Sequence, residues 1–189
     1  MIKHKIVCMG DSLTEGYQIK QGTCWPTLLN KEPHLEIVNS GICGDTTAGM
    51  LARFQADVIA NQPSYVIIMG GTNDIWFNMP DSQIIANIVA MTRHARHHQI
   101  QSIIGVPSPY YLPENAEADR FFMDLKGMHS RLLEYKKTLR RFIKEDAQPF
   151  IDFTINMTPD LFLEDGIHPN EIGHEMMTNN AQEFLNTFL

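Results

Sequence analysis

Residues 6–12 are Ile6-Val7-Cys8-Met9-Gly10-Asp11-Ser12, a short apolar run that ends at a glycine and passes directly into a polar turn. Four more apolar runs of similar length follow along the chain, at residues 35–38, 65–69, 102–106 and 149–152. Short continuous apolar runs are typical of strands that are covered on both faces, and such strands belong to parallel sheets. The sequence therefore predicts a central parallel sheet of five strands.

Longer helical patterns fill the intervals between these runs. They begin at Trp25, at a cap on Thr46 or Thr47, at a cap on Asp81 or Ser82, at Phe121, and at Pro169, which suits a first helical position. Alternation of strands with helices predicts a three-layer α/β/α domain.

The composition is that of a globular protein, with 189 residues of which 43% are hydrophobic and 20% charged. A chain of this size buries about 70% of its surface on folding, which is enough for one core, so we expect a single domain over residues 1–189. The net charge of −7 disfavours a nucleic-acid partner. The cysteines Cys8, Cys24 and Cys43 are odd in number and form no C-x-x-C pair, which disfavours a disulfide framework.

The cellular location is predicted from two features of the sequence. No apolar run approaches the roughly 18 to 20 residues that a membrane span needs. Residues 1–7 hold too short an apolar stretch for a signal peptide and no small-residue cleavage site. We therefore expect a cytoplasmic protein without a membrane span.

Polar and glycine-rich turns follow the first three predicted strands, at residues 10–12, 40–45 and 70–74, and a further polar stretch at residues 165–169 precedes the last helix. In open parallel sheets, ligands bind outside the carboxyl ends of the strands. These four stretches are therefore expected to form the functional site.

Their residue types fit acyl transfer, which needs a hydroxyl nucleophile, a base, a carboxylate that orients the base, and donors for the oxyanion. Ser12 follows the first strand directly, and Asp165 lies three residues before His168, a spacing that lets the carboxylate reach the ring Nδ1 while Nε2 faces Ser12. Gly44 can present a bare N–H group, and the side-chain amide of Asn73 is a second donor. Each feature alone also fits a turn or a helix cap, so the prediction rests on their combination.

Other signatures fail or are incomplete. The chain has no G-x-S-x-G and no G-x-G-x-x-G, and the P-loop glycine spacing at residues 44–51 carries Met50 and Leu51 in place of Lys and Ser/Thr. His94, His97 and His98 lie at helical spacing, but no carboxylate or cysteine accompanies them, so a solvated helix end is expected. We therefore expect neither a metal nor a cofactor.

The four stretches together resemble the ordered blocks of the SGNH, or GDSL, hydrolase superfamily. The matching residues are Gly10-Asp11-Ser12-Leu13, Gly41 to Gly44, Gly71-Thr72-Asn73-Asp74 and Asp165-Gly166-Ile167-His168-Pro169. Residues 44–53 are especially similar to the bacterial thioesterase/lysophospholipase branch.

This resemblance implies a flavodoxin-like α/β/α fold and hydrolysis of esters or thioesters. It implies Ser12 as the nucleophile, His168 as the base and Asp165 as its orienting partner. It also implies an oxyanion hole formed by the Ser12 N–H, the Gly44 N–H and the Asn73 side chain, and it favours Gly44 over Gly41. Two alternatives stay open: a carbohydrate acetylesterase with the same three residues, and a non-catalytic flavodoxin-like binding module.

Aromatic residues near these blocks in the sequence are candidates for an acyl pocket, although ordinary packing also explains them. The candidates are Trp76, Phe77, Tyr110 and Tyr111. The prolines of residues 107–119 predict an irregular rim beside the site. The small acyl ester or thioester that would bind there is the expected partner.

The long helix carries two further stripes. Its apolar stripe steps by three and four residues, which fits packing on the sheet, and a homodimer seam is the alternative, so the oligomeric state is left open. Its basic stripe predicts a solvated face. The apolar stripe is Phe121, Leu125, Met128, Leu132, Tyr135, Leu139 and Phe142, and the basic one is Lys136, Lys137, Arg140, Arg141 and Lys144.

Overall fold

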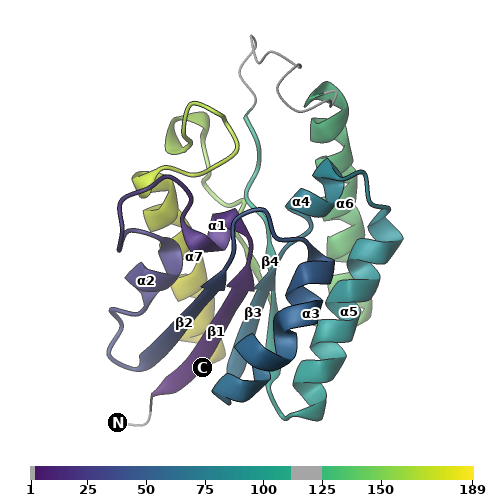
Figure 1. Cartoon of the computed structure of the whole chain (residues 1–189). Helices are drawn as coiled ribbons and strands as arrows, with labels where there is room; N and C mark the ends of the chain where they lie inside the picture. Colours follow the sequence, from purple (N-terminus) through teal and green to yellow (C-terminus); the bar gives the residue numbers. More distant parts are fainter. Residues whose placement is uncertain (1–2, 112–124) are drawn as a thin grey trace.

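A computed structural model describes residues 3–111 and 125–189 of the chain and shows five parallel strands in the order β2-β1-β3-β4-β5 (Figure 1). The strands are β1 (His4–Gly10), β2 (Leu35–Gly41), β3 (Tyr65–Met69), β4 (Gln101–Val106) and β5 (Phe150–Asp152). Gly10 lies opposite Gly41 of β2 and Met69 of β3 in the register. The turns that follow β1, β2 and β3 therefore all leave the sheet at its carboxyl edge. The predicted parallel sheet is confirmed.

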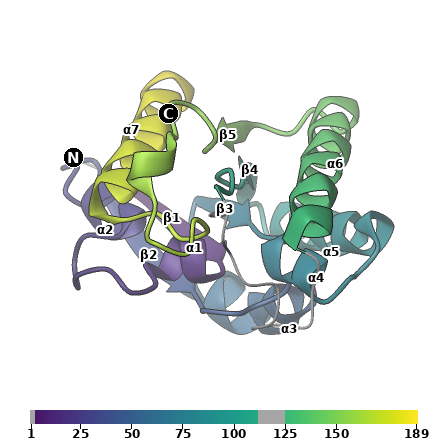
Figure 2. The same ribbon diagram turned by 90° about the horizontal axis from the view of Figure 1, so that it is seen from above.

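Helices cover both faces of this sheet, as the view from above shows (Figure 2). The helices α2 (Trp25–Leu29) and α7 (Glu171–Phe188) lie on one face, and α3 (Thr47–Asp57), α5 (Asp81–His97) and α6 (Leu125–Glu145) lie on the other. Each face has its own buried apolar cluster, one containing Phe54 and Tyr135 and the other containing Trp25 and Phe153. The predicted three-layer α/β/α architecture is therefore confirmed.

The predicted helix starts were correct at α3 and wrong at α5 and α7. The Thr46 side chain accepts a hydrogen bond from the N–H of Gly49 at 3.2 Å, as predicted for a cap. Pro80 occupies the cap position of α5 and makes no side-chain cap bond. Asn170 caps α7 by accepting from the N–H of Gly173 at 3.0 Å, so Pro169 precedes the helix. The Asn170 amide is the better cap because its oxygen satisfies a free N–H group of the first turn.

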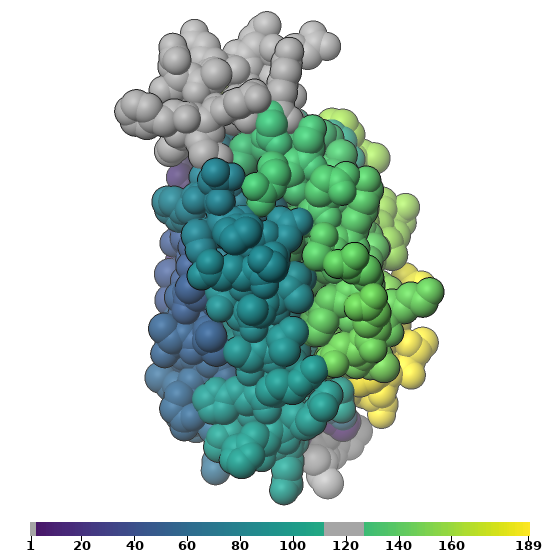
Figure 3. Space-filling model, turned by 90° about the vertical axis from the view of Figure 1, so that its right-hand side faces the viewer, coloured from purple at the N-terminus to yellow at the C-terminus, as the bar shows by residue number. Residues whose placement is uncertain are grey.

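The apolar stripe of α6 packs inside the molecule. Met128, Leu132, Tyr135 and Leu139 are buried in the cluster between α6 and the sheet, which confirms sheet packing for the described part of the stripe. Phe121 lies outside the described residues. Figure 3 shows the outer face of this layer, where α5 and α6 lie side by side.

One residue of the basic stripe is not solvated. Lys136 is buried, and its Nζ donates to the carbonyl oxygen of Ser108 at 2.8 Å. Burial and, to a smaller extent, the nearby charge of Arg140 lower the pKa of Lys136 to about 7 against the opposing effect of Asp152. The prediction of a fully solvated stripe was wrong at this position because the segment after β4 covers the lysine.

None of the described helices is long and apolar enough to cross a membrane.

Candidate active site

The first strand delivers Ser12 to the carboxyl edge of the sheet. After Gly10, the Oδ1 atom of Asp11 accepts a hydrogen bond from the N–H of Leu13 at 3.0 Å and starts the short helix α1 (Ser12–Glu15). A Cβ atom on Gly10 would collide with the side chain of Thr14, so the strand can end here only on a glycine. Ser12 is therefore held as the first residue of a helix that begins directly at the end of the strand.

Asp11 itself is buried beneath this turn. Burial, together with the nearby charge of Asp74, raises the pKa of Asp11 to about 7 against the opposing effects of the hydrogen bond from Leu13 and of the neighbouring His168. Its second oxygen, Oδ2, has no hydrogen-bond partner among the described residues. Asp11 is thus a carboxyl group that changes charge near neutral pH close to the serine.

Three side chains predicted to act together do form one series of hydrogen bonds. The Nε2 atom of His168 lies 3.0 Å from the Oγ atom of Ser12, and Nδ1 lies 2.6 Å from the Oδ2 atom of Asp165. With the proton on Nδ1, the ring donates to Asp165 and Nε2 is free to accept from the Ser12 hydroxyl. The structure thus brings the three predicted residues together in one hydrogen-bonded series.

The backbone around Asp165 fixes this carboxylate in place. Its Oδ1 atom accepts from the N–H groups of Ile167 at 2.8 Å and His168 at 2.9 Å. Partial burial raises the pKa of Asp165, but the hydrogen bonds from the His168 ring and from the two N–H groups outweigh it and lower the pKa below its usual value. The carboxylate therefore stays charged and keeps facing Nδ1.

The two predicted oxyanion donors lie on neighbouring turns. Gly44 is exposed in a left-handed conformation with φ of +77°. Asn73 lies in the helix α4 (Thr72–Trp76), and its Nδ2 atom donates one hydrogen bond to the carbonyl oxygen of Asp45 at 2.9 Å. An amide nitrogen carries two hydrogens, so a second one is left to donate. This bond places the Asn73 amide directly beside the loop that carries Gly44.

Gly41 and Gly44 differ in the space that a side chain would have at each position. A Cβ atom on Gly41 would collide with the backbone nitrogen of Glu15 in α1, whereas a Cβ atom on Gly44 would meet open space. Gly41 is therefore needed for the close approach of β2 to the helix that carries Ser12.

Two charged residues that the sequence analysis did not single out tie these turns together. Asp74 accepts hydrogen bonds from the N–H of Thr47 at 2.9 Å and from its hydroxyl at 2.5 Å. Arg53 bonds the carboxylate of Asp45 at 2.8 Å and the carbonyl oxygen of Gly10 at 3.0 Å. The turns after β1, β2 and β3 are thus linked by buried or half-buried polar contacts. A signal existed for Asp74, since it directly follows Asn73 in the third block.

Tyr17 is a further neighbour of the histidine that the sequence did not point to. Its ring centroid lies 4.5 Å from that of His168, with 42° between the ring planes. The two residues are far apart in the chain, so no local pattern signals the contact.

The four candidate pocket residues do not share one environment. Trp76 is half-buried and Phe77 is 69% exposed at the end of α4, next to Asn73. Tyr110 is buried in the core, which raises its pKa, whereas the hydroxyl of Tyr111 donates to the carbonyl oxygen of Met157 on the other face of the sheet. The pocket therefore stays a prediction, and residues 112–119 of the predicted rim lie outside the described residues.

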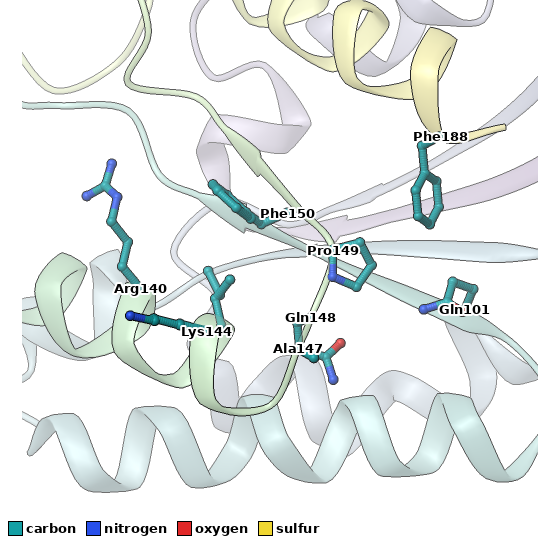
Figure 4. A pocket seen from close by; sticks show the side chains of 9 residues that line it. Gln101, Arg140, Lys144, Ala147, Gln148, Pro149, Phe150 and Phe188 are labelled. Carbon is teal, nitrogen blue, oxygen red and sulfur yellow. The ribbon is translucent and has the colours of Figure 1, made fainter.

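A surface hollow lies at the opposite end of the sheet. It has a volume of about 730 Å³ and surrounds the start of β5 (Figure 4). Pro149, Phe150 and Phe188 line it together with the end of α6. This hollow is far from the hydrogen-bonded serine, because β4 and β5 begin there and end at the site.

Side chains suited to metal binding do not gather in the described part of the chain. Within residues 3–111 and 125–189, no three His, Cys, Asp or Glu side chains lie close enough together to hold a metal ion. At the end of α5 the His98 ring contacts the rings of His94 and His97, with centroid distances of 5.3 Å and 5.1 Å.

The protein is a three-layer α/β/α domain with a serine, a histidine and an aspartate in one hydrogen-bonded series at the carboxyl edge of its parallel sheet. This is the arrangement of a serine-type hydrolase. The sequence model of the GDSL-like lipase/acylhydrolase family matches residues 8–176, so the chain belongs to this family. The resemblance drawn from the four sequence blocks is thereby confirmed.

Individual relatives agree with this assignment. The chain is 27% identical over 170 residues to thioesterase 1/protease 1/lysophospholipase L1 of Escherichia coli K12, covering 87% of this chain and 75% of that protein. It is 26% identical over 173 residues to an arylesterase of Vibrio mimicus, covering 87% and 80%. A solved structure from Desulfitobacterium hafniense, described as of the lipolytic G-D-S-L family, is 28% identical with a TM-score of 0.82 and covers 96% of this chain and 99% of that one. The protein is therefore an enzyme of the ester-hydrolysing GDSL family.

Proposed function

We propose that the protein hydrolyses small acyl esters or thioesters through an acyl-enzyme intermediate on Ser12. His168 removes the Ser12 proton as the oxygen attacks the acyl carbonyl, and then protonates the leaving alcohol or thiol. Water attacks the acyl-serine with His168 again as the base, which releases the acid and restores the serine. The observation that carries this proposal is the hydrogen-bonded series from Ser12 through His168 to Asp165.

The oxyanion of each tetrahedral intermediate is held by three donors in this scheme. They are the N–H groups of Ser12 and Gly44 and the second hydrogen of the Asn73 amide. The Ser12 N–H belongs to the first turn of α1, where N–H groups have no partner inside the helix. Such preorganised donors stabilise the charge that develops in the transition state.

Replacement of the serine tests the mechanism. We expect Ser12→Ala to lower kcat for p-nitrophenyl acetate by at least about 10³-fold, because the nucleophile is lost. Ser40→Ala is the matched control, since Ser40 is the second-last residue of the neighbouring strand β2 and has no imidazole partner in the described structure. Hydrolysis by Ser12→Ala at the wild-type rate would refute the proposed mechanism.

The leaving group and the acyl chain are tested with a substrate panel. The arylesterase and thioesterase relatives suggest that aryl esters and acyl thioesters be compared first. A panel of p-nitrophenyl esters of rising chain length, acyl-CoA and acetylated xylose separates esterase, thioesterase and carbohydrate acetylesterase activities. Failure of every ester and thioester would favour the flavodoxin-like binding module.

Three further expectations belong to this proposal. The single domain over residues 1–189 predicts one protease-resistant fragment. The cytoplasmic location predicts activity in the cytosolic fraction of the source cell. The oligomeric state is read from the light-scattering mass, where a value of one chain would exclude a homodimer.

A further inference from the structure

The ring of Tyr17 packs against the His168 imidazole at the proposed site, with 42° between the ring planes. The centroids are 4.5 Å apart, well inside the roughly 6 Å over which an aromatic face attracts a cation. The side chain of His168 is 18% exposed, so the imidazole is partly removed from water at this contact.

The turn after α1 fixes Tyr17 in this place. Gly16 has φ of +95°, and a Cβ atom on it would lie 2.6 Å from the Cβ atom of Cys24, so only glycine fits. The N–H groups of Gly16 and Tyr17 both donate to the carbonyl oxygen of Ser12, at 3.0 Å and 3.2 Å. The backbone of the serine thus anchors the residue whose ring packs against the histidine.

The hydroxyl group of Tyr17 takes no part in this contact. It accepts a hydrogen bond from the Nε2 atom of Gln18 at 3.1 Å, in an exposed position. The contact with His168 is therefore a property of the ring.

We propose that Tyr17 is a positioning residue of the hydrolytic site, whose aromatic ring holds the His168 imidazole toward Ser12 and stabilises the imidazolium that forms when the serine loses its proton. This proposal rests on the function proposed above. The face of an aromatic ring carries negative charge density, so it favours the protonated imidazole over the neutral one. An interaction of this kind at a partly desolvated position changes a rate or an equilibrium by about 2- to 30-fold.

Among the described residues, Asp165, Asp11 and His174 are titratable groups that act on His168, and all three remain in every Tyr17 variant. Asp165 lies on the same loop, Asp11 lies in the turn after β1, and His174 lies on α7. A difference between the pH profiles of wild type and variant therefore isolates the effect of the ring.

Two substitutions separate the ring from its hydroxyl. We expect Tyr17→Leu to lower kcat/KM and the rate of inactivation by a fluorophosphonate by about 2- to 30-fold, with KM little changed. The acid limb of the kcat/KM profile moves to lower pH by about 0.4 to 1.5 units, because the protonated imidazole loses a stabilising neighbour. Tyr17→Phe keeps the ring and stays within about 2-fold of wild type.

Tyr65→Leu is the matched control. The Tyr65 ring also lies beside a histidine, with its centroid 5.8 Å from that of His4, but at the start of β3 and away from the site. This variant is expected to keep the wild-type pH profile. If Tyr17→Leu fails to fold, a pentafluorophenylalanine in place of Tyr17 keeps the size of the ring and reverses its charge distribution, and the same shift of the acid limb is expected.

The outcomes distinguish this proposal from the underlying mechanism. An inactivation rate unaffected by His168→Ala would refute the proposed function. A large loss in His168→Ala together with a wild-type rate and an unmoved acid limb in Tyr17→Leu would refute only the role of Tyr17. An equal loss in Tyr17→Phe and Tyr17→Leu would also refute it, because the hydroxyl would then be responsible.

Discussion

The substitution Asp165→Asn is expected to move the ring proton of His168 from Nδ1 to Nε2 while keeping the number of side-chain heavy atoms. The Oδ1 atom of Asp165 accepts two backbone N–H groups, at 2.8 Å and 2.9 Å, so an asparagine places its single oxygen there. The NH₂ group then occupies the position of Oδ2, which lies 2.6 Å from Nδ1 of His168. Because that group can only donate, Nδ1 becomes the acceptor and the ring proton moves to Nε2. The ring then points an N–H group at Ser12 and cannot remove its proton.

The size of the effect follows from this loss of the base. With the wrong tautomer, a serine hydrolase retains its binding and oxyanion donors but loses general base catalysis, which lowers kcat by about 10⁴-fold. We expect a loss of about 10³- to 10⁴-fold for Asp165→Asn with p-nitrophenyl acetate at pH 8. The melting temperature changes little, because both backbone hydrogen bonds to Oδ1 are kept.

Asp160→Asn is the control for this substitution. Asp160 is an exposed aspartate in the short 3-10 turn Pro159–Leu161, and its side chain makes no hydrogen bond in the described structure. It is expected to keep wild-type kcat. A kcat of Asp165→Asn within 10-fold of wild type, in a folded protein, would refute the tautomer argument.

Three other predictions follow from the same region. Asn73→Ala should lower kcat by about 10²-fold through loss of one oxyanion donor, and an unchanged kcat would remove only that role. Burial lowers the pKa of His174 from 6.5 to about 4. As the pH falls, the unfolded chain therefore protonates at this histidine before the folded protein does, so the free energy of unfolding decreases by up to about 3 kcal/mol between pH 6.5 and pH 4. In His174→Gln, the free energy of unfolding measured in urea should depend less on pH over this range. Gly41→Ala should lower kcat, and it should lower the free energy of unfolding in urea by about 1 to 3 kcal/mol, through its collision with α1. Gly44→Ala meets open space and costs about 1 kcal/mol of backbone strain; an unchanged free energy of unfolding in Gly41→Ala would contradict this.

The sheet could be predicted from sequence because its signal is local. The strands β1, β3 and β4 are buried on both faces over most of their length, so runs such as residues 65–69 are continuously apolar and end at glycine or proline. Because the strands are parallel, their carboxyl ends lie on the same edge of the sheet. This rule alone predicts that Ser12 and Asn73, which follow two of the strands, lie at the same edge.

The remaining features depend on contacts between distant segments. Lys136 looked solvated because its neighbours in the helix are charged, but its ammonium group donates to the carbonyl oxygen of Ser108, which is distant in the sequence. The contact of Tyr17 with His168 has the same origin, since it joins the turn after α1 to the loop before α7. A periodicity within one helix or turn contains no information about which other segment will cover it.

The aromatic pocket shows a related limit. Tyr110 and Tyr111 are neighbours in sequence, but they belong to the apolar clusters on opposite faces of the sheet. Consecutive residues in an extended segment point in opposite directions, so closeness in the chain did not place them in one wall.

The central claim is that the hydroxyl of Ser12 is activated by His168 and Asp165. Mass spectrometry of the protein after reaction with a fluorophosphonate tests it most directly. The account predicts one phosphonate per chain, located on the peptide that contains Ser12, and no labelling at that site in His168→Ala over the same time. A label on another residue, or equal labelling of Ser12 without the histidine, would contradict it.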